Sequence, residues 1–203
     1  MFGLIATAIS VAVKVVSVIG QLGIALKGLE LIGRILVSVA KALGLIEDKK
    51  IETEELGDKA LQAEAEGIKP ENYKTYQEYM KAIEEFELDP EKSKNWTEKE
   101  KIAKGIEITS ALLVDKYGPD IQDLIIEVAK NPEFFNTERV KEYIQIIEDK
   151  KISYSEISDY LDGNIRKFEH QDKVNNAMLE VEKKVNPTIS DADAQRLINS
   201  QKR

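Results

Sequence analysis

The sequence has no cysteine and only one histidine in 203 residues. Without cysteine, disulfides, zinc fingers, iron–sulfur clusters and thiol nucleophiles are all excluded. One histidine also excludes metal sites built from several imidazoles. The residue types that usually hold a metal or redox group are therefore missing, and we expect no cofactor.

Basic residues are also fewer than acidic ones. The chain carries 29 Lys and Arg against 37 Asp and Glu, which gives a formal charge of −8. Proteins that bind nucleic acid rely on a positive surface to neutralise phosphates, so we expect no nucleic-acid partner. The length is sufficient for one domain with a substantial core, or for one domain with an appendage.

Composition divides the chain at residue 46. Residues 1–46 hold four basic residues and one acid, a net charge of +3, while residues 47–203 carry −11. Six of the eleven glycines fall in the first segment and all five prolines in the second. We therefore predict two units: a weakly basic apolar hairpin over 1–46 that associates with membrane or with itself, and an acidic helical docking domain over 47–203.

The first segment is apolar enough to meet a bilayer. Lys14 is the only charged side chain between Met1 and Leu26. A lysine at that depth makes a full span costly, by about 2.5–3.5 kcal/mol. No basic region precedes the apolar run, so a secretory signal peptide is not expected. The localisation is left open, with a virion or a membrane surface as candidates.

Polar residues follow a helical spacing in this segment. Ser10, Lys14, Ser17 and Gln21 are separated by four, three and four residues. A second polar stripe begins at Lys27, and it is out of phase with the first. The change of phase falls near Gly20 and Gly23, which predicts helices over about 3–19 and 24–43 joined at these glycines. The alternating segment 9–15 offers a strand as the alternative.

The predicted second helix has one apolar and one polar face. A segment with such narrow polar stripes needs cover on nearly every side, and we expect that cover to come from outside the chain. The apolar face is predicted to pack in an assembly or against a membrane, while the polar stripe faces water, an acidic neighbour or lipid headgroups. The apolar face comprises Leu26, Leu29, Ile32, Leu36 and Leu43, and the stripe comprises Lys27, Arg34 and Lys41.

The acidic body is predicted to be a bundle of short, capped helices. Capping boxes are expected at Thr97–Glu100 and Ser153–Glu156, and Thr137 and Ser190 are expected to cap two further helices. Apolar periodicity runs on from Ile157 through Phe168 to Val185. Nothing in this segment alternates like a strand, so the fold class is all-α: a glycine-rich apolar hairpin followed by a helical bundle.

Chemistry-bearing patterns are few. His170 lies beside Glu169 with no nucleophile motif near it, and the chain has no phosphate-binding glycine loop and no serine-hydrolase or zinc-protease motif. The sequence therefore predicts a protein that is not an enzyme. One aromatic group is placed either in the core or on a partner-binding face. It comprises Tyr73, Tyr76, Tyr79 and Met80.

Three functions fit these features. The first is a non-enzymatic component of a bacterial or phage assembly of the virion, secretion or injection type, which forms homo-oligomers or binds other proteins. A second is a membrane-active, pore-forming or toxin-like protein. A third is a soluble enzyme or regulatory binder in which the apolar hairpin is internal.

Overall fold

The computed structural model describes residues 2–203 and, over this range, consists of helices joined by turns, without strands. The predicted all-α class is confirmed, and the strand alternative over residues 9–15 is wrong because this segment is helical. The helices are α1 (Phe2–Gln21), α2 (Leu26–Ala42), α3 (Thr53–Ala65), a 3₁₀ turn η1 (Pro70–Asn72), α4 (Tyr76–Glu85), α5 (Pro90–Ser93), α6 (Glu98–Tyr117), α7 (Ile121–Lys130), α8 (Thr137–Lys150), α9 (Tyr154–Leu161), α10 (Phe168–Val185) and α11 (Asp191–Asn199).

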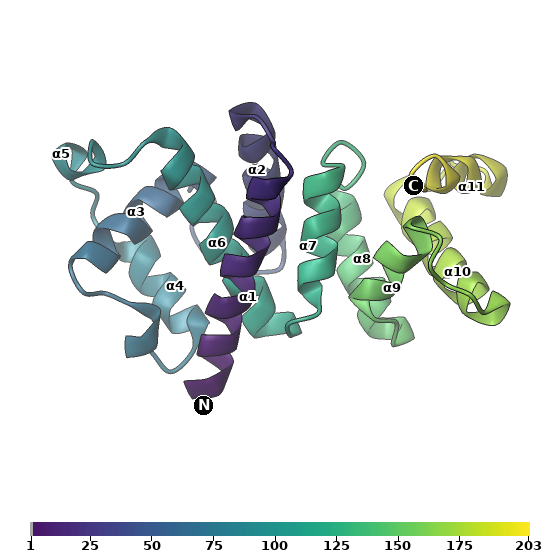
Figure 1. Cartoon of the computed structure of the whole chain (residues 1–203), viewed down its shortest axis with the longest axis horizontal. Helices are drawn as coiled ribbons and strands as arrows, with labels where there is room; N and C mark the ends of the chain where they lie inside the picture. The colour runs from purple at the N-terminus through teal and green to yellow at the C-terminus, as the bar shows by residue number, and fades with distance from the viewer. Residues whose placement is uncertain (1) are drawn as a thin grey trace.

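Helix α6 is the centre of one end of the molecule. Figure 1 shows α1–α6 gathered at this end of an elongated chain and α7–α11 at the other. Apolar or small side chains occur all round α6, and every residue from Ile108 to Val114 is buried. Helices α1, α2, α3, α4 and α7 all pack against it. The apolar middle of α6 is therefore enclosed by other helices.

Helices α1 and α2 both pack against α6. The turn between them occupies 22–25, and Gly23 adopts φ 65°, a left-handed conformation suited to glycine. Both helices pack mainly on α6 rather than on each other. Helix α1 also contacts α7, and helix α2 also contacts α7 and α8. One apolar core includes Ile5, Ile32, Leu56 and Ile106. Residues 1–46 and residues 47–203, which differ in composition, therefore share one core in the folded chain.

The other end of the molecule is a layered helical array. Helix α9 packs on α7, and α10 packs on α8, α9 and α11. Arg139 of α8 binds Glu182 of α10 through three contacts: Nε–Oε1 at 2.9 Å, Nε–Oε2 at 3.1 Å and Nη2–Oε2 at 2.9 Å. Glu182 is fully buried, so this pair ties the two helices together inside the core.

The predicted helix ends are mostly confirmed. Both capping boxes form, at Thr97 and at Ser153, and Ser190 caps α11. At α8 the cap is Asn136 rather than Thr137, because the Asn136 side chain accepts the backbone N–H of Arg139.

The apolar periodicity beyond Ile157 does not form one continuous helix. The chain leaves the helical conformation between α9 and α10, where Gly163 adopts φ 71°. Phe168 is consequently 82% exposed instead of packed.

Candidate functional site

The predicted apolar face of α2 lies inside the protein. Ile32 and Leu36 are fully buried and Leu29 nearly so, while Leu26 and Leu43 are half-buried against the same core. Helices α6 and α8 supply the cover. The expectation that this face is covered from outside the chain is wrong, because composition could not show which other helices close over it.

The predicted polar stripe of α2 divides between solvent and a loop contact. Lys27 and Arg34 are exposed. The Lys41 ammonium donates to the backbone carbonyls of Lys49 and Ile51, at 3.1 and 2.6 Å. Lys41 therefore holds the loop between α2 and α3 in place.

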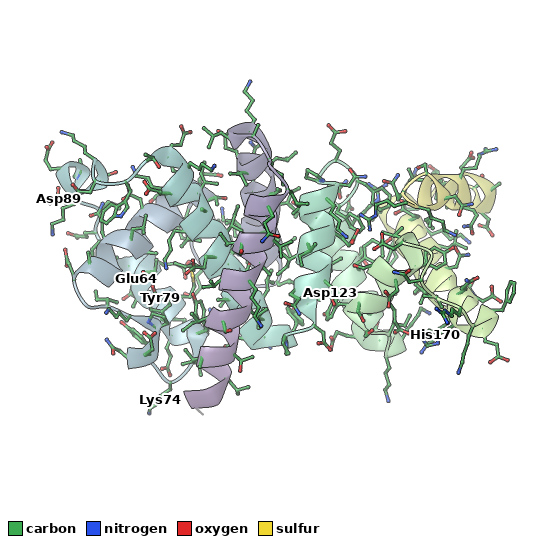
Figure 2. The ribbon with its side chains drawn as sticks, viewed as in Figure 1. Glu64, Lys74, Tyr79, Asp89, Asp123 and His170 are labelled. Atoms are coloured by element: carbon green, nitrogen blue, oxygen red, sulfur yellow. The ribbon has the colours of Figure 1, made fainter. Side chains whose placement is uncertain are left out.

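The aromatic group around α4 belongs to the core. Tyr76, Tyr79 and Met80 are buried and Tyr73 is half-buried, so the partner-face interpretation of this group is wrong. The Tyr79 hydroxyl donates to Glu64 across 3.1 Å, and Figure 2 shows these two side chains together at the α1–α6 end. Burial raises the pKa of Tyr79, and the neighbouring Glu64 carboxylate adds to this. Tyr79 is accordingly a neutral hydrogen-bond donor.

A polar pocket of about 210 Å³ opens beside Tyr76, between α1, α4 and α6. The Lys104 ammonium lies 2.8 Å from Glu64 and 2.8 Å from Glu107. Burial lowers the pKa of Lys104, but the two carboxylates more than compensate and leave it above its ordinary value. Lys104 therefore stays protonated, and a protonated amine cannot act as a base or a nucleophile.

A second polar cluster joins α3, α5 and α6. The Lys101 ammonium lies 2.7 Å from the Ser93 hydroxyl and 3.2 Å from the Asp58 carboxylate, and Ser93 donates to Asp58. A serine next to a lysine is one arrangement for nucleophilic catalysis. Here Lys101 is the donor to Ser93 and pairs with Asp58, while the Ser93 hydroxyl directs its own proton to Asp58. The cluster instead anchors the short helix α5.

The remaining candidates for chemistry are isolated from one another. His170 contacts Glu156 at the α7–α11 end, far from Glu64 and Tyr79 (Figure 2), and Asp191 pairs with Lys183 across 2.6 Å. Among residues 2–203, no group of three or more acids, histidines or cysteines is placed to hold a metal.

Three of the four large apolar side chains that stay exposed in the described part of the chain lie on α1 or directly after it. Val13 is 50% exposed at its middle, and Leu4 and Leu22 are 69% and 43% exposed at its two ends. Only Phe168 joins them as an exposed large apolar residue in the described part of the chain. No other helix crosses in front of α1 in the view of Figure 1.

Val13 also belongs to a regular row of apolar and small positions along α1, which includes neither Leu4 nor Leu22. Its members are separated by three, four, three and four residues, which is the spacing of a helix that packs along another helix. Ala6 and Gly20 are exposed, Val13 is half-exposed, and Ile9 and Val16 are partly buried at the edge of the core. We call this the α1 seam: Ala6, Ile9, Val13, Val16 and Gly20.

One described helix is also long and apolar enough to cross a membrane, by length and composition alone. It is the stretch Leu4–Gln21 of α1, of which 33% is buried within the protein. Core helices of soluble proteins meet the same criterion. The sequence-based expectation of an interacting N-terminal segment thus falls on α1 rather than on α2.

Comparison with protein-family models, with curated proteins and with solved structures finds no match to this chain.

Proposed function

We propose that this protein is a non-enzymatic component of a multiprotein assembly and that it self-associates through the α1 seam. The observation that carries the proposal is the exposure of Val13 in the middle of an apolar seam with heptad spacing. The polar clusters around Lys104 and Lys101 are engaged in ion pairs and hydrogen bonds that join helices.

A second copy of the chain is the occupant that the seam fits best. The seam is nearly symmetric about Val13, with Ala6 seven residues before it and Gly20 seven residues after it. In an antiparallel pair, Val13 would meet Val13 of the second copy, and Ala6 would meet Gly20 of the second copy. Such a contact is isologous, since the same patch serves both subunits. The small residues at both ends allow the helices to approach closely.

Charge is compatible with this pairing. Lys14 is the only charged residue on α1 and is exposed, about a third of a turn away from the seam. An antiparallel arrangement also places the positive N-terminal end of each helix dipole beside the negative end of the other. No unpaired charge is buried when two copies pack in this way.

Lipid is a poorer fit to the same helix. A helix that rests in a membrane interface presents large apolar residues such as Leu, Phe and Trp outward. Here the large residues Ile5, Val15 and Ile19 point into the core. The outward arc carries Ser10, Lys14 and Ser17 instead.

Sedimentation velocity of the full chain over a concentration series tests the proposal. Val13→Glu would place two unpaired carboxylates face to face at the centre of the dimer. We expect the dimer dissociation constant to rise about 100-fold, equivalent to about 2.7 kcal/mol. Circular dichroism should show an unchanged fold, because Val13 is half-exposed in the free chain.

Phe168→Glu is the matched control, since it replaces an exposed apolar residue outside the seam. It should leave the dissociation constant unchanged. A wild-type chain that remains monomeric at every concentration would overturn the proposal. Flotation with vesicles of phosphatidylcholine and phosphatidylglycerol that Val13→Glu abolishes would overturn it in favour of a lipid surface.

A further inference from the structure

The last four residues of the chain lie across a recess between α7 and α9. Arg203 donates its backbone N–H to the carbonyl of Leu161 across 2.9 Å. Its side-chain Nη2 lies 3.0 and 2.9 Å from the two carboxylate oxygens of Glu127, and its Nε lies 2.7 Å from Asp162 Oδ1. Two acids and one carbonyl thus surround a single arginine.

The site matches a guanidinium group in particular. Glu127 is 1% exposed. Its Oε1 is also bound by the Lys130 ammonium at 2.8 Å and the Ser158 hydroxyl at 3.0 Å, whereas Arg203 is the partner the structure gives for Oε2. Removing the guanidinium would leave a buried carboxylate oxygen aimed into the recess without a donor. The planar guanidinium places Nη2 on Glu127 and Nε on Asp162, so that two different nitrogens serve the two carboxylates.

Residues 200–202 continue the last turn of α11 through backbone hydrogen bonds, while the contacts of this segment with other parts of the chain are polar ones that a second chain can reproduce. The segment carries no apolar side chain. The Asn131 amide donates to Gln201 across 2.6 Å, and the Lys202 ammonium lies 4.2 Å from the centre of the Tyr160 ring. A recess of about 230 Å³ remains beside the segment.

The other arginine on a buried glutamate is different. Arg139 and Glu182 both come from the interiors of long helices, and Arg139 also lies over the Phe134 ring. That pair cannot separate without parting α8 from α10. The Arg203 contact can open while all the helices stay in place.

We propose that Glu127, Asp162 and the Leu161 carbonyl form a recognition site for an arginine in a peptide segment. Arg203 fills this site within its own chain, and a partner segment with arginine preceded by a second cation competes for it. The backbone N–H, the guanidinium fork and the cation over Tyr160 define that ligand chemistry. The site does not depend on the α1 seam, so the two proposals fail or stand separately.

The first test uses the full-length variant Arg203→Ala with ethylguanidinium as the probe. We expect the Tm to fall by roughly 5 °C, because Oε2 of the buried Glu127 carboxylate loses its donor. Millimolar ethylguanidinium should restore the Tm saturably, whereas ethylammonium should not. The wild type, whose site is filled, and the double variant Arg203→Ala/Glu127→Gln should not respond.

The second test measures binding in trans and does not depend on thermal stability. The probe is a fluorescent peptide with the sequence of residues 200–203, and its control carries citrulline in place of arginine. By anisotropy, Arg203→Ala should bind the arginine peptide at least about tenfold more tightly than the wild type, in which Arg203 competes. Equal binding by both proteins, equal binding of the citrulline peptide, or an ethylguanidinium response shared by all variants would overturn the proposal.

Discussion

The backbone nitrogen of Gly105 lies 2.7 Å from the point where a Cβ atom would stand on Gly57. Helices α3 and α6 therefore touch backbone to backbone at these two glycines. Thr53, one turn before Gly57 on α3, is also close to Gly105, since its backbone oxygen would be 2.1 Å from a Cβ atom there. This contact fixes the position of α6 relative to α3. Helices α1, α2, α4 and α7 pack around α6 as well.

Gly105→Ala should destabilise the fold strongly. The new methyl group would overlap the backbone carbonyl of Thr53, which cannot rotate away as a side chain could. We expect a loss of about 2–4 kcal/mol in the free energy of unfolding by urea. Gly20→Ala is the control, because nothing lies within 4 Å of its Cβ position, and it should be neutral or stabilise by up to about 1 kcal/mol. Equal effects of the two changes would contradict the packing described.

Ile32→Ala should lower stability by about 2–5 kcal/mol, since it opens a cavity in a fully buried part of α2. Lys27→Ala, on the exposed side of the same helix, should change stability by no more than about 0.5 kcal/mol. Chemical denaturation measures both. An unfolding free energy that is unchanged in Ile32→Ala would indicate that α2 is not part of the core.

A fragment of residues 47–203 should fail to fold cooperatively. Without α1 and α2, the buried faces of α6 and α8 would be exposed to water. We expect retained helical circular dichroism, a broad thermal transition and binding of a hydrophobic dye, which together mark a molten globule. A sharp melting transition in this fragment would instead support an autonomous acidic domain.

Asp123→Asn should stabilise the protein at neutral pH. Burial raises the pKa of Asp123, and the carboxylates of Asp120, Asp159 and Glu127 add to this. Because the folded state holds this proton more tightly, ionisation costs stability as pH rises from about 4, the ordinary aspartate value, through the raised pKa.

We therefore expect the Asp123→Asn variant to gain roughly 1–3 °C in Tm at pH 7 and little below pH 4. Asp191→Asn serves as the control, because Asp191 is exposed and pairs with Lys183. It should show no gain. A lower Tm for Asp123→Asn at pH 7 would contradict the electrostatic argument.

Local signals allowed most helices to be predicted from the sequence. The capping boxes at Thr97 and Ser153 and the glycine at position 23 act within a few residues, so their effects are visible in the chain itself. Gly163 carried the signal for the break before α10, but the apolar periodicity around it obscured that signal.

Long-range packing could not be predicted in the same way. The sequence showed that α2 needs cover but not that α6 and α8 provide it, because this depends on contacts far along the chain. The pairing of Glu127 with Arg203 spans 76 positions and follows no spacing rule. The α1 seam is legible in the sequence, but it becomes distinct from the core only when the buried side of α1 is known.

Disulfide trapping of a single-cysteine variant tests the central claim, self-association through the α1 seam, most directly. The chain has no cysteine, so Val13→Cys introduces the only thiol. An antiparallel pair brings this position against its own copy, within the Cα separation of about 4.4–6.8 Å that a disulfide requires. In the same pair, Ala6 would lie about 21 Å from Ala6 of the second copy. The account predicts that mild oxidation yields a covalent dimer from Val13→Cys, and none from Ala6→Cys or Phe168→Cys. A dimer from Ala6→Cys as readily as from Val13→Cys, or no dimer from Val13→Cys, would contradict it.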